Sequence, residues 1–192
     1  MQDVLTPAAR RILDVAAELF YENGIHAVGV DRIAAAAGVT KKTLYDRFGA
    51  KDALVERYLR ERDERWRDYL YEVLDEASRS SPVRRVLLVF DALQDWMDEK
   101  CPRGCAFVNA YAELPDDGHP GRTVIAEQKQ WLFERIHELA RATGARAPRK
   151  LAEELAVLLE GAMVVRTAGV IPDGIAVAKR TARKLVAAAT AG

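Results

Sequence analysis

The chain has 192 residues, and its 29 lysines and arginines are balanced by 29 aspartates and glutamates. A hydrophobic fraction of 49% with 30% charged residues is typical of a folded globular protein and excludes a disordered one. We expect no signal peptide and no membrane partner, since no uncharged run approaches the roughly 20 apolar residues of a membrane span. Two cysteines are too few for a disulfide framework, which favours the reducing cytoplasm.

Apolar residues recur at helical spacing along most of the chain, whereas the alternating pattern of strands is scarce. Thr6 and Thr40 are suitable N-caps, and prolines at positions 82, 120 and 148 suit a first helical turn. The pattern predicts about nine helices, at residues 7–23, 30–37, 40–48, 51–77, 82–101, 104–114, 120–142, 148–168 and 172–189. We therefore expect an all-α protein.

Motifs for enzymatic or metal chemistry are incomplete. All serines lie within residues 78–81 and lack the flanking glycines of a nucleophile elbow. Glu134 and His137 have the spacing of half a di-iron site, but the chain offers no second Glu-x-x-His pair. Cys101 and Cys105 have no partner pair at zinc-finger spacing, so buried free thiols are the better interpretation. We expect neither an enzyme nor a metal or other cofactor.

Residues 30–48 carry a more specific pattern. Two short helices separated by Gly38 have the spacing of a helix-turn-helix, and small alanines allow the two helices to approach closely. The second helix would present its polar and basic side chains away from that packing, and residues 40–51 hold four basic residues against one acid, Asp46. Charge and spacing alone leave two interpretations open, a DNA-reading helix or an ordinary solvated basic face. The candidate DNA-contacting residues are Thr40, Lys41, Lys42, Thr43, Tyr45, Arg47 and Lys51.

The segment from Gly24 to Leu54 resembles the helix-turn-helix signature of the TetR family of bacterial transcriptional repressors. The matching positions are Ile33-Ala34, Gly38-Val39, Thr43-Leu44-Tyr45, Phe48, Lys51 and Leu54. Two positions depart from the family pattern: Ala50 replaces a frequent capping serine, and Arg47 replaces a frequent histidine. The resemblance implies a three-helix DNA-binding domain at residues 1–50 and a larger effector-binding and dimerisation domain at residues 51–192.

The resemblance further implies a repressor that binds a double-stranded, pseudo-palindromic operator as a homodimer and is released by a small-molecule effector. Lysines of the second helix would reach guanine edges, with Thr40, Tyr45 and Lys51 on phosphates. Two alternatives stay open: an activator or dual regulator on the same fold, and a small-molecule-binding helical protein whose DNA-binding head is vestigial.

The resemblance implies that the last two helices form the dimer interface, and the apolar stripes and small residues there suit a four-helix contact between subunits. The candidate interface residues are Leu155, Leu158, Leu159, Ala162, Ala178, Ala182 and Leu185. The competing interpretation is that these stripes complete the core of a single subunit.

An effector pocket is expected to be mostly apolar with a few orienting polar groups. Asn109 and Glu113 lie four residues apart on one helix face, and both would enter a cavity if that face turned inward. The alternative is that Asn109 caps a backbone group and that Glu113 is solvated or ion-paired. The apolar candidates are Trp66, Phe90, Met97, Phe107 and Met163.

Overall fold

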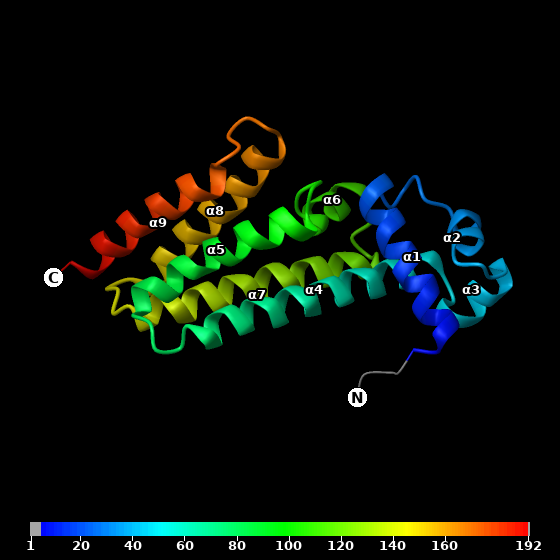
Figure 1. Ribbon diagram of the computed structural model, residues 1–192, viewed down its shortest axis with the longest axis horizontal. Coiled ribbons are helices and arrows are strands. Elements are labelled where there is room, and N and C mark those ends of the chain that lie inside the picture. The colour runs from blue at the N-terminus through cyan, green and yellow to red at the C-terminus, as the bar shows by residue number, and fades with distance from the viewer. Residues whose placement is uncertain (1–4, 192) are drawn as a thin grey trace. The chain divides into compact units, whose positions relative to one another are not determined.

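A computed structural model describes residues 5–191, which form nine helices and no strand (Figure 1). The expected all-α class is therefore confirmed. The helices are α1 (Pro7–Asn23), α2 (Val30–Ala36), α3 (Lys41–Phe48), α4 (Lys51–Glu76), α5 (Pro82–Lys100), α6 (Ala106–Glu113), α7 (Pro120–Ala142), α8 (Pro148–Thr167) and α9 (Gly174–Thr190). Their ends lie within two residues of the predicted positions.

Side-chain caps explain where several helices begin. Thr6, Thr40 and Ser81 precede α1, α3 and α5, and each hydroxyl accepts the amide three residues later, at 3.3, 3.1 and 3.3 Å. Such a bond satisfies one of the amide groups that a helix start leaves without an internal partner. Ala50, which precedes α4, has no side-chain oxygen to do the same.

The first compact unit contains the described residues up to Glu64 together with Ala106–Glu127. It holds α1, α2, α3, the first part of α4, α6 and the start of α7. The three N-terminal helices pack against one another around fully or almost fully buried side chains, namely Ile12, Leu13, Ala16, Phe20, Ile33 and Leu44. The functional boundary at residue 50 stays a prediction, but the compact unit that contains the head also includes α6.

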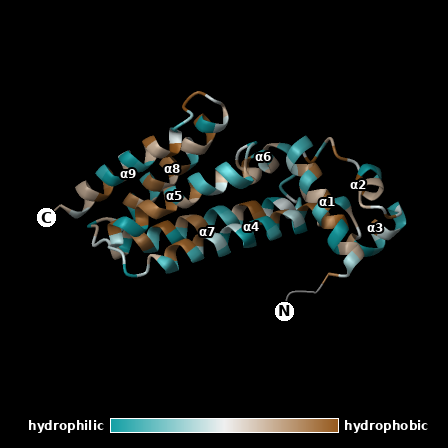
Figure 2. Ribbon diagram, in the orientation of Figure 1, coloured by the Kyte–Doolittle hydropathy of each residue, from teal (hydrophilic) through white to brown (hydrophobic). Residues whose placement is uncertain are grey.

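The second compact unit contains Arg65–Cys105 and the described residues from Gln128 onward. Within it α9 packs against both α5 and α8, and one hydrophobic core joins side chains from α4, α5, α7, α8 and α9. Hydrophilic and hydrophobic residues alternate along α4 and α7, as expected for helices with one buried side (Figure 2). No helix within residues 5–191 is long and apolar enough to cross a membrane.

Candidate nucleic-acid interface

Helices α2 and α3 form the predicted helix-turn-helix. Gly38 has a φ of +64° in the turn, a conformation that glycine adopts without steric cost. The Val39 amide donates to the Ala34 carbonyl at 3.0 Å, and Ile33 and Leu44 are fully buried. Apolar packing on one side of α3 therefore leaves its opposite side to the solvent.

The exposed side of α3 carries most of the predicted DNA-contacting residues. Thr40, Lys41, Lys42, Tyr45 and Arg47 are all exposed. Thr43 is half-buried, and its hydroxyl lies 2.9 Å from the hydroxyl of Thr40. Since Thr40 also caps α3, its side chain orders the start of the helix as well as facing solvent.

Two lysines of this surface have carboxylate partners. Lys41 Nζ lies 3.0 Å from Asp31, which raises the pKa of the lysine, and Lys42 Nζ lies 3.4 Å from Asp46 one turn later. Exposed ion pairs of this kind are screened by solvent and contribute little to stability. A phosphate or a base edge could therefore replace either carboxylate at small cost. Arg47 has no hydrogen-bond or ion-pair partner among residues 5–191.

Lys51 occupies a different environment from the other predicted contacts. Its ammonium donates to the Ile25 carbonyl at 2.6 Å and lies 5.9 Å from the centre of the Phe20 ring. Burial lowers the pKa of Lys51 below its usual value, while the nearby charges of Asp52 and Glu113 act in the opposite direction. Lys51 thus holds the loop between α1 and α2, and contact with a phosphate stays a prediction.

Glu113, at the end of α6, contacts the same loop. Its Oε2 accepts the backbone amide of His26 at 2.8 Å. Gly24 has a φ of +88°, and a Cβ at this position would lie 2.9 and 3.0 Å from the two Glu113 carboxylate oxygens. A side chain at residue 24 would meet both a strained backbone and the carboxylate.

One peptide group therefore joins these helices. The Ile25 carbonyl accepts from Lys51, and the His26 amide of the same peptide donates to Glu113. The Ile25–His26 peptide group connects the head to the start of α4 and to the end of α6, all within the first compact unit. Sequence reasoning missed this role of Glu113 because a contact 87 residues away leaves no local pattern.

The predicted effector residues do not form one site. Asn109 is exposed, and Glu113 accepts the His26 amide, so the two do not form an inward-facing polar pair, and effector contact by either residue stays a prediction. Phe107 is buried in the first compact unit. The remaining four belong to the hydrophobic core of the second unit, namely Trp66, Phe90, Met97 and Met163.

Most of the predicted dimer-interface residues face inward. Five have at most 5% of their surface exposed and so cannot also cover a partner, namely Leu155, Leu159, Ala162, Ala178 and Ala182. These five lie in the core of the subunit, as the competing interpretation expects, while Leu158 and Leu185 are half-buried, and the dimer interface stays a prediction. Val157 and Val164, which widen the apolar stripe of α8 beyond its core-facing side, are 74% and 56% exposed.

The residues considered for metal chemistry are dispersed. No three metal-ligating side chains gather within residues 5–191. His137 lies 3.7 Å from Glu134, whose carboxylate also accepts from Gln130. Cys101 is buried and Cys105 is half-buried, and no disulfide joins them.

Comparison with known proteins identifies the family in which this arrangement of helices is found. Residues 12–58 match the family model described as "Bacterial regulatory proteins, tetR family". A solved structure of SCO4454, a TetR-family transcriptional regulator from Streptomyces coelicolor, superimposes with a TM-score of 0.89 at 30% identity, covering 97% of this chain and 91% of that one. The chain belongs to the TetR family.

Curated TetR-family relatives agree with this assignment. The HTH-type transcriptional regulator YjdC of Escherichia coli is 30% identical over 112 residues, 58% of this chain and 56% of YjdC. The match thus spans about half the length of that relative. The HTH-type transcriptional repressor DhaR of Mycobacterium sp. is 28% identical over 166 residues, 83% of this chain and 82% of DhaR. These relatives are named as regulators and not as enzymes.

Proposed function

We propose that the chain is a DNA-binding transcriptional repressor that acts in the cytoplasm as a homodimer and is released from its operator by a small-molecule effector. The observation that carries the proposal is the exposed basic and polar side of α3, behind which Leu44 anchors the helix in the core. A rigid helix of this kind fits the major groove, where lysine and arginine recognise guanine. The name of DhaR as a repressor favours repression over activation.

Dimerisation is supported by the exposed α8 stripe. Val157 and Val164 lie seven residues apart on one helix face, and Gly161 between them has open space around it. A glycine at this place would let a second helix approach closely. A two-fold dimer formed here would present two copies of α3 to operator half-sites about one or more helical turns apart.

Release of the operator would use the Ile25–His26 peptide group. We propose that effector binding among the C-terminal helices shifts α6, so that Glu113 no longer accepts the His26 amide and the loop that positions the head loosens. A coupling free energy of about 1–3 kcal/mol would change operator affinity roughly 5- to 150-fold. This is of the same order as the value of one charge-assisted hydrogen bond.

The proposal is tested by titrating the protein against DNA duplexes that tile the region upstream of its own gene, with fluorescence anisotropy at several salt concentrations. We expect tight binding to one fragment, with two subunits bound to each operator duplex, and a steep loss of affinity as the salt concentration rises. The double variant Lys42→Ala/Arg47→Ala should lose this binding. The matched variant Arg141→Ala/Lys150→Ala, which removes two exposed cations on α7 and α8, should retain it. Weak and equal binding to every fragment would contradict an operator in this region.

A further inference from the structure

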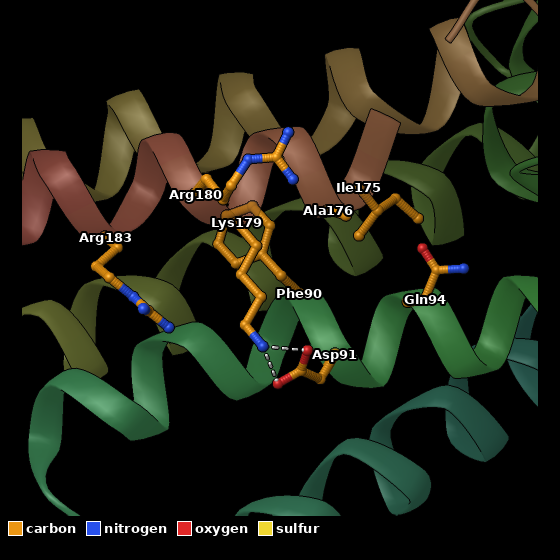
Figure 3. A pocket seen from close by; sticks show the side chains of 8 residues that line it. All are labelled: Phe90, Asp91, Gln94, Ile175, Ala176, Lys179, Arg180 and Arg183. Carbon is orange, nitrogen blue, oxygen red and sulfur yellow. Dashed lines mark hydrogen bonds and ion pairs between the residues drawn. The ribbon is translucent and has the colours of Figure 1, made fainter. Parts of the chain in front are cut away.

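A groove of about 300 Å³ lies between α5 and α9, within the second compact unit (Figure 3). Phe90 and Ile175 are among its lining residues but are almost fully buried in the core, so its accessible apolar surface comes from Ala176 and the aliphatic stems of the longer side chains. The volume is at the lower end of the range for small-molecule sites. None of the polar side chains of this groove was among the sequence-predicted effector residues.

The charge of the groove is strongly positive although the whole chain is neutral. Helix α9 contains Lys179, Arg180, Arg183 and Lys184 and has no acidic residue between Gly174 and Thr190. The first three of these cations line the groove, and the only carboxylate among its lining residues is Asp91.

Asp91 neutralises only one of the three cations. Both of its oxygens accept from Lys179 Nζ, at 2.5 and 2.7 Å. Arg180 and Arg183 make no hydrogen bond or ion pair with any residue between positions 5 and 191. Lys179 and Arg183 extend from α9 toward α5, whereas the Arg180 guanidinium stays near α9 (Figure 3).

Arg180 and Arg183 lie three residues apart on α9, and neither has a carboxylate partner among residues 5–191. The planar fork of donors on either guanidinium matches the two oxygens of a carboxylate, so a carboxylate ligand would supply the missing partner. Ala176, which is exposed at the groove, and the aliphatic stems of Lys179 and Arg183 would contact an apolar body attached to that carboxylate. Asp91 disfavours ligands of higher negative charge, because its own carboxylate lines the same groove.

We propose that the α5–α9 groove binds a small organic anion, a monocarboxylate with a compact apolar body. The site lies in the second compact unit, whereas the DNA-contacting residues lie in the first. The inference goes beyond the proposed function, and its test uses no DNA.

The test is a fluorescence titration with 2-naphthoate, its uncharged analogue 2-naphthalenemethanol, and 2-naphthyl phosphate. The wild-type protein should bind 2-naphthoate at least about tenfold more tightly than the alcohol, as one charge-assisted hydrogen bond would give. Arg180→Gln/Arg183→Gln should abolish this preference. Arg84→Gln, which removes an exposed arginine of α5 outside the groove, should leave it unchanged.

A second variant locates the binding. Ala176 is exposed at the groove, and Ala176→Trp would fill the space, so 2-naphthoate should bind at least about tenfold more weakly while the thermal unfolding midpoint stays near that of wild type. Equal affinity for the acid and the alcohol, or undiminished binding in either groove variant, would overturn the proposal. Tighter binding of the phosphate than of 2-naphthoate would overturn the choice of a carboxylate.

Discussion

Three residues far apart in the sequence determine the geometry of one short loop. Lys51 and Glu113 bond opposite ends of the Ile25–His26 peptide group, and Gly24 provides the room for the Glu113 carboxylate. Because both bonds involve a charged partner, each is stronger than a bond between neutral groups. The loop precedes α2, so its conformation fixes where the helix-turn-helix begins.

Glu113→Ala should destabilise this loop more than any other part of the chain. The His26 amide would lose its acceptor, and we expect the free energy of unfolding to fall by about 1–3 kcal/mol. Hydrogen exchange measured by NMR should show faster exchange of that amide. The control is Glu18→Ala, which removes an exposed carboxylate of α1 and should change neither quantity. Unchanged exchange at His26 would show that the bond does not persist in solution.

Asp98 gives the chain a stabilising contact that depends on pH. Hydrogen bonds from Gln94 and Arg166 lower the pKa of Asp98 below its usual 3.8. Because the pKa of Asp98 is lower in the folded state than in the unfolded state, its ionised carboxylate stabilises the folded state at pH values above the unfolded-state pKa. This contribution is lost as the pH falls through the folded-state pKa. Asp98→Asn should therefore be less stable than wild type at pH 7.

Urea denaturation between pH 7 and pH 2.5 measures this difference. The difference in the free energy of unfolding between wild type and Asp98→Asn should shrink as the pH falls below 3.8. The control Asp75→Asn, at an exposed position at the end of α4, should show no such trend. A gap of constant size across the range would mean that Asp98 stabilises the chain without its charge.

At the level of single helices, α8 has two different apolar faces. One faces the core through Leu155 and Leu159, and the other exposes Val157 and Val164. Periodicity in the sequence indicates both faces, because the apolar residues of α8 extend beyond one side of a helix. It could not tell which face is internal, because that depends on where α5 and α9 pack.

Val164→Glu should convert the proposed dimer into a monomer. A carboxylate in the middle of the exposed stripe would have to lose its hydration without gaining a partner. Sedimentation velocity should give a dimer for wild type and a monomer for the variant. Val108→Glu, on the exposed side of α6, is the matched control and should sediment as wild type does. A dimeric Val164→Glu would place the interface elsewhere.

Helix α3 allows base contacts and phosphate contacts to be distinguished. Lys42→Ala should weaken operator binding and also relax base preference at one position, whereas Tyr45→Phe should weaken binding by a similar factor for all sequences. Anisotropy titrations against an operator and its single-base variants provide both numbers. Uniform weakening by Lys42→Ala would reassign Lys42 to the phosphate backbone.

At the scale of the whole molecule, local signals predicted the helices well and the site less completely. Thr6, Thr40 and Ser81 act as caps, and the buried Leu44 follows from the helix-turn-helix spacing. These features depend on residues three or four positions apart. The bond from His26 to Glu113 and the groove between α5 and α9 join segments far apart in the chain. Such contacts depend on how the helices pack, and no repeating pattern of residues in the sequence predicts them.

The Ile25–His26 peptide group also limits how freely DNA-binding heads of this kind can be exchanged between proteins. A chimera joined at residue 50 would take its loop from one parent, while Lys51 and Glu113 would come from the other. The incoming loop would then need a glycine that admits the recipient's carboxylate and a peptide plane turned to suit both charges. Recombination between relatives should therefore succeed most often where both parents share this lysine and glutamate. A head that is exchanged as a unit should include α6 and should not stop at the first residue of α4.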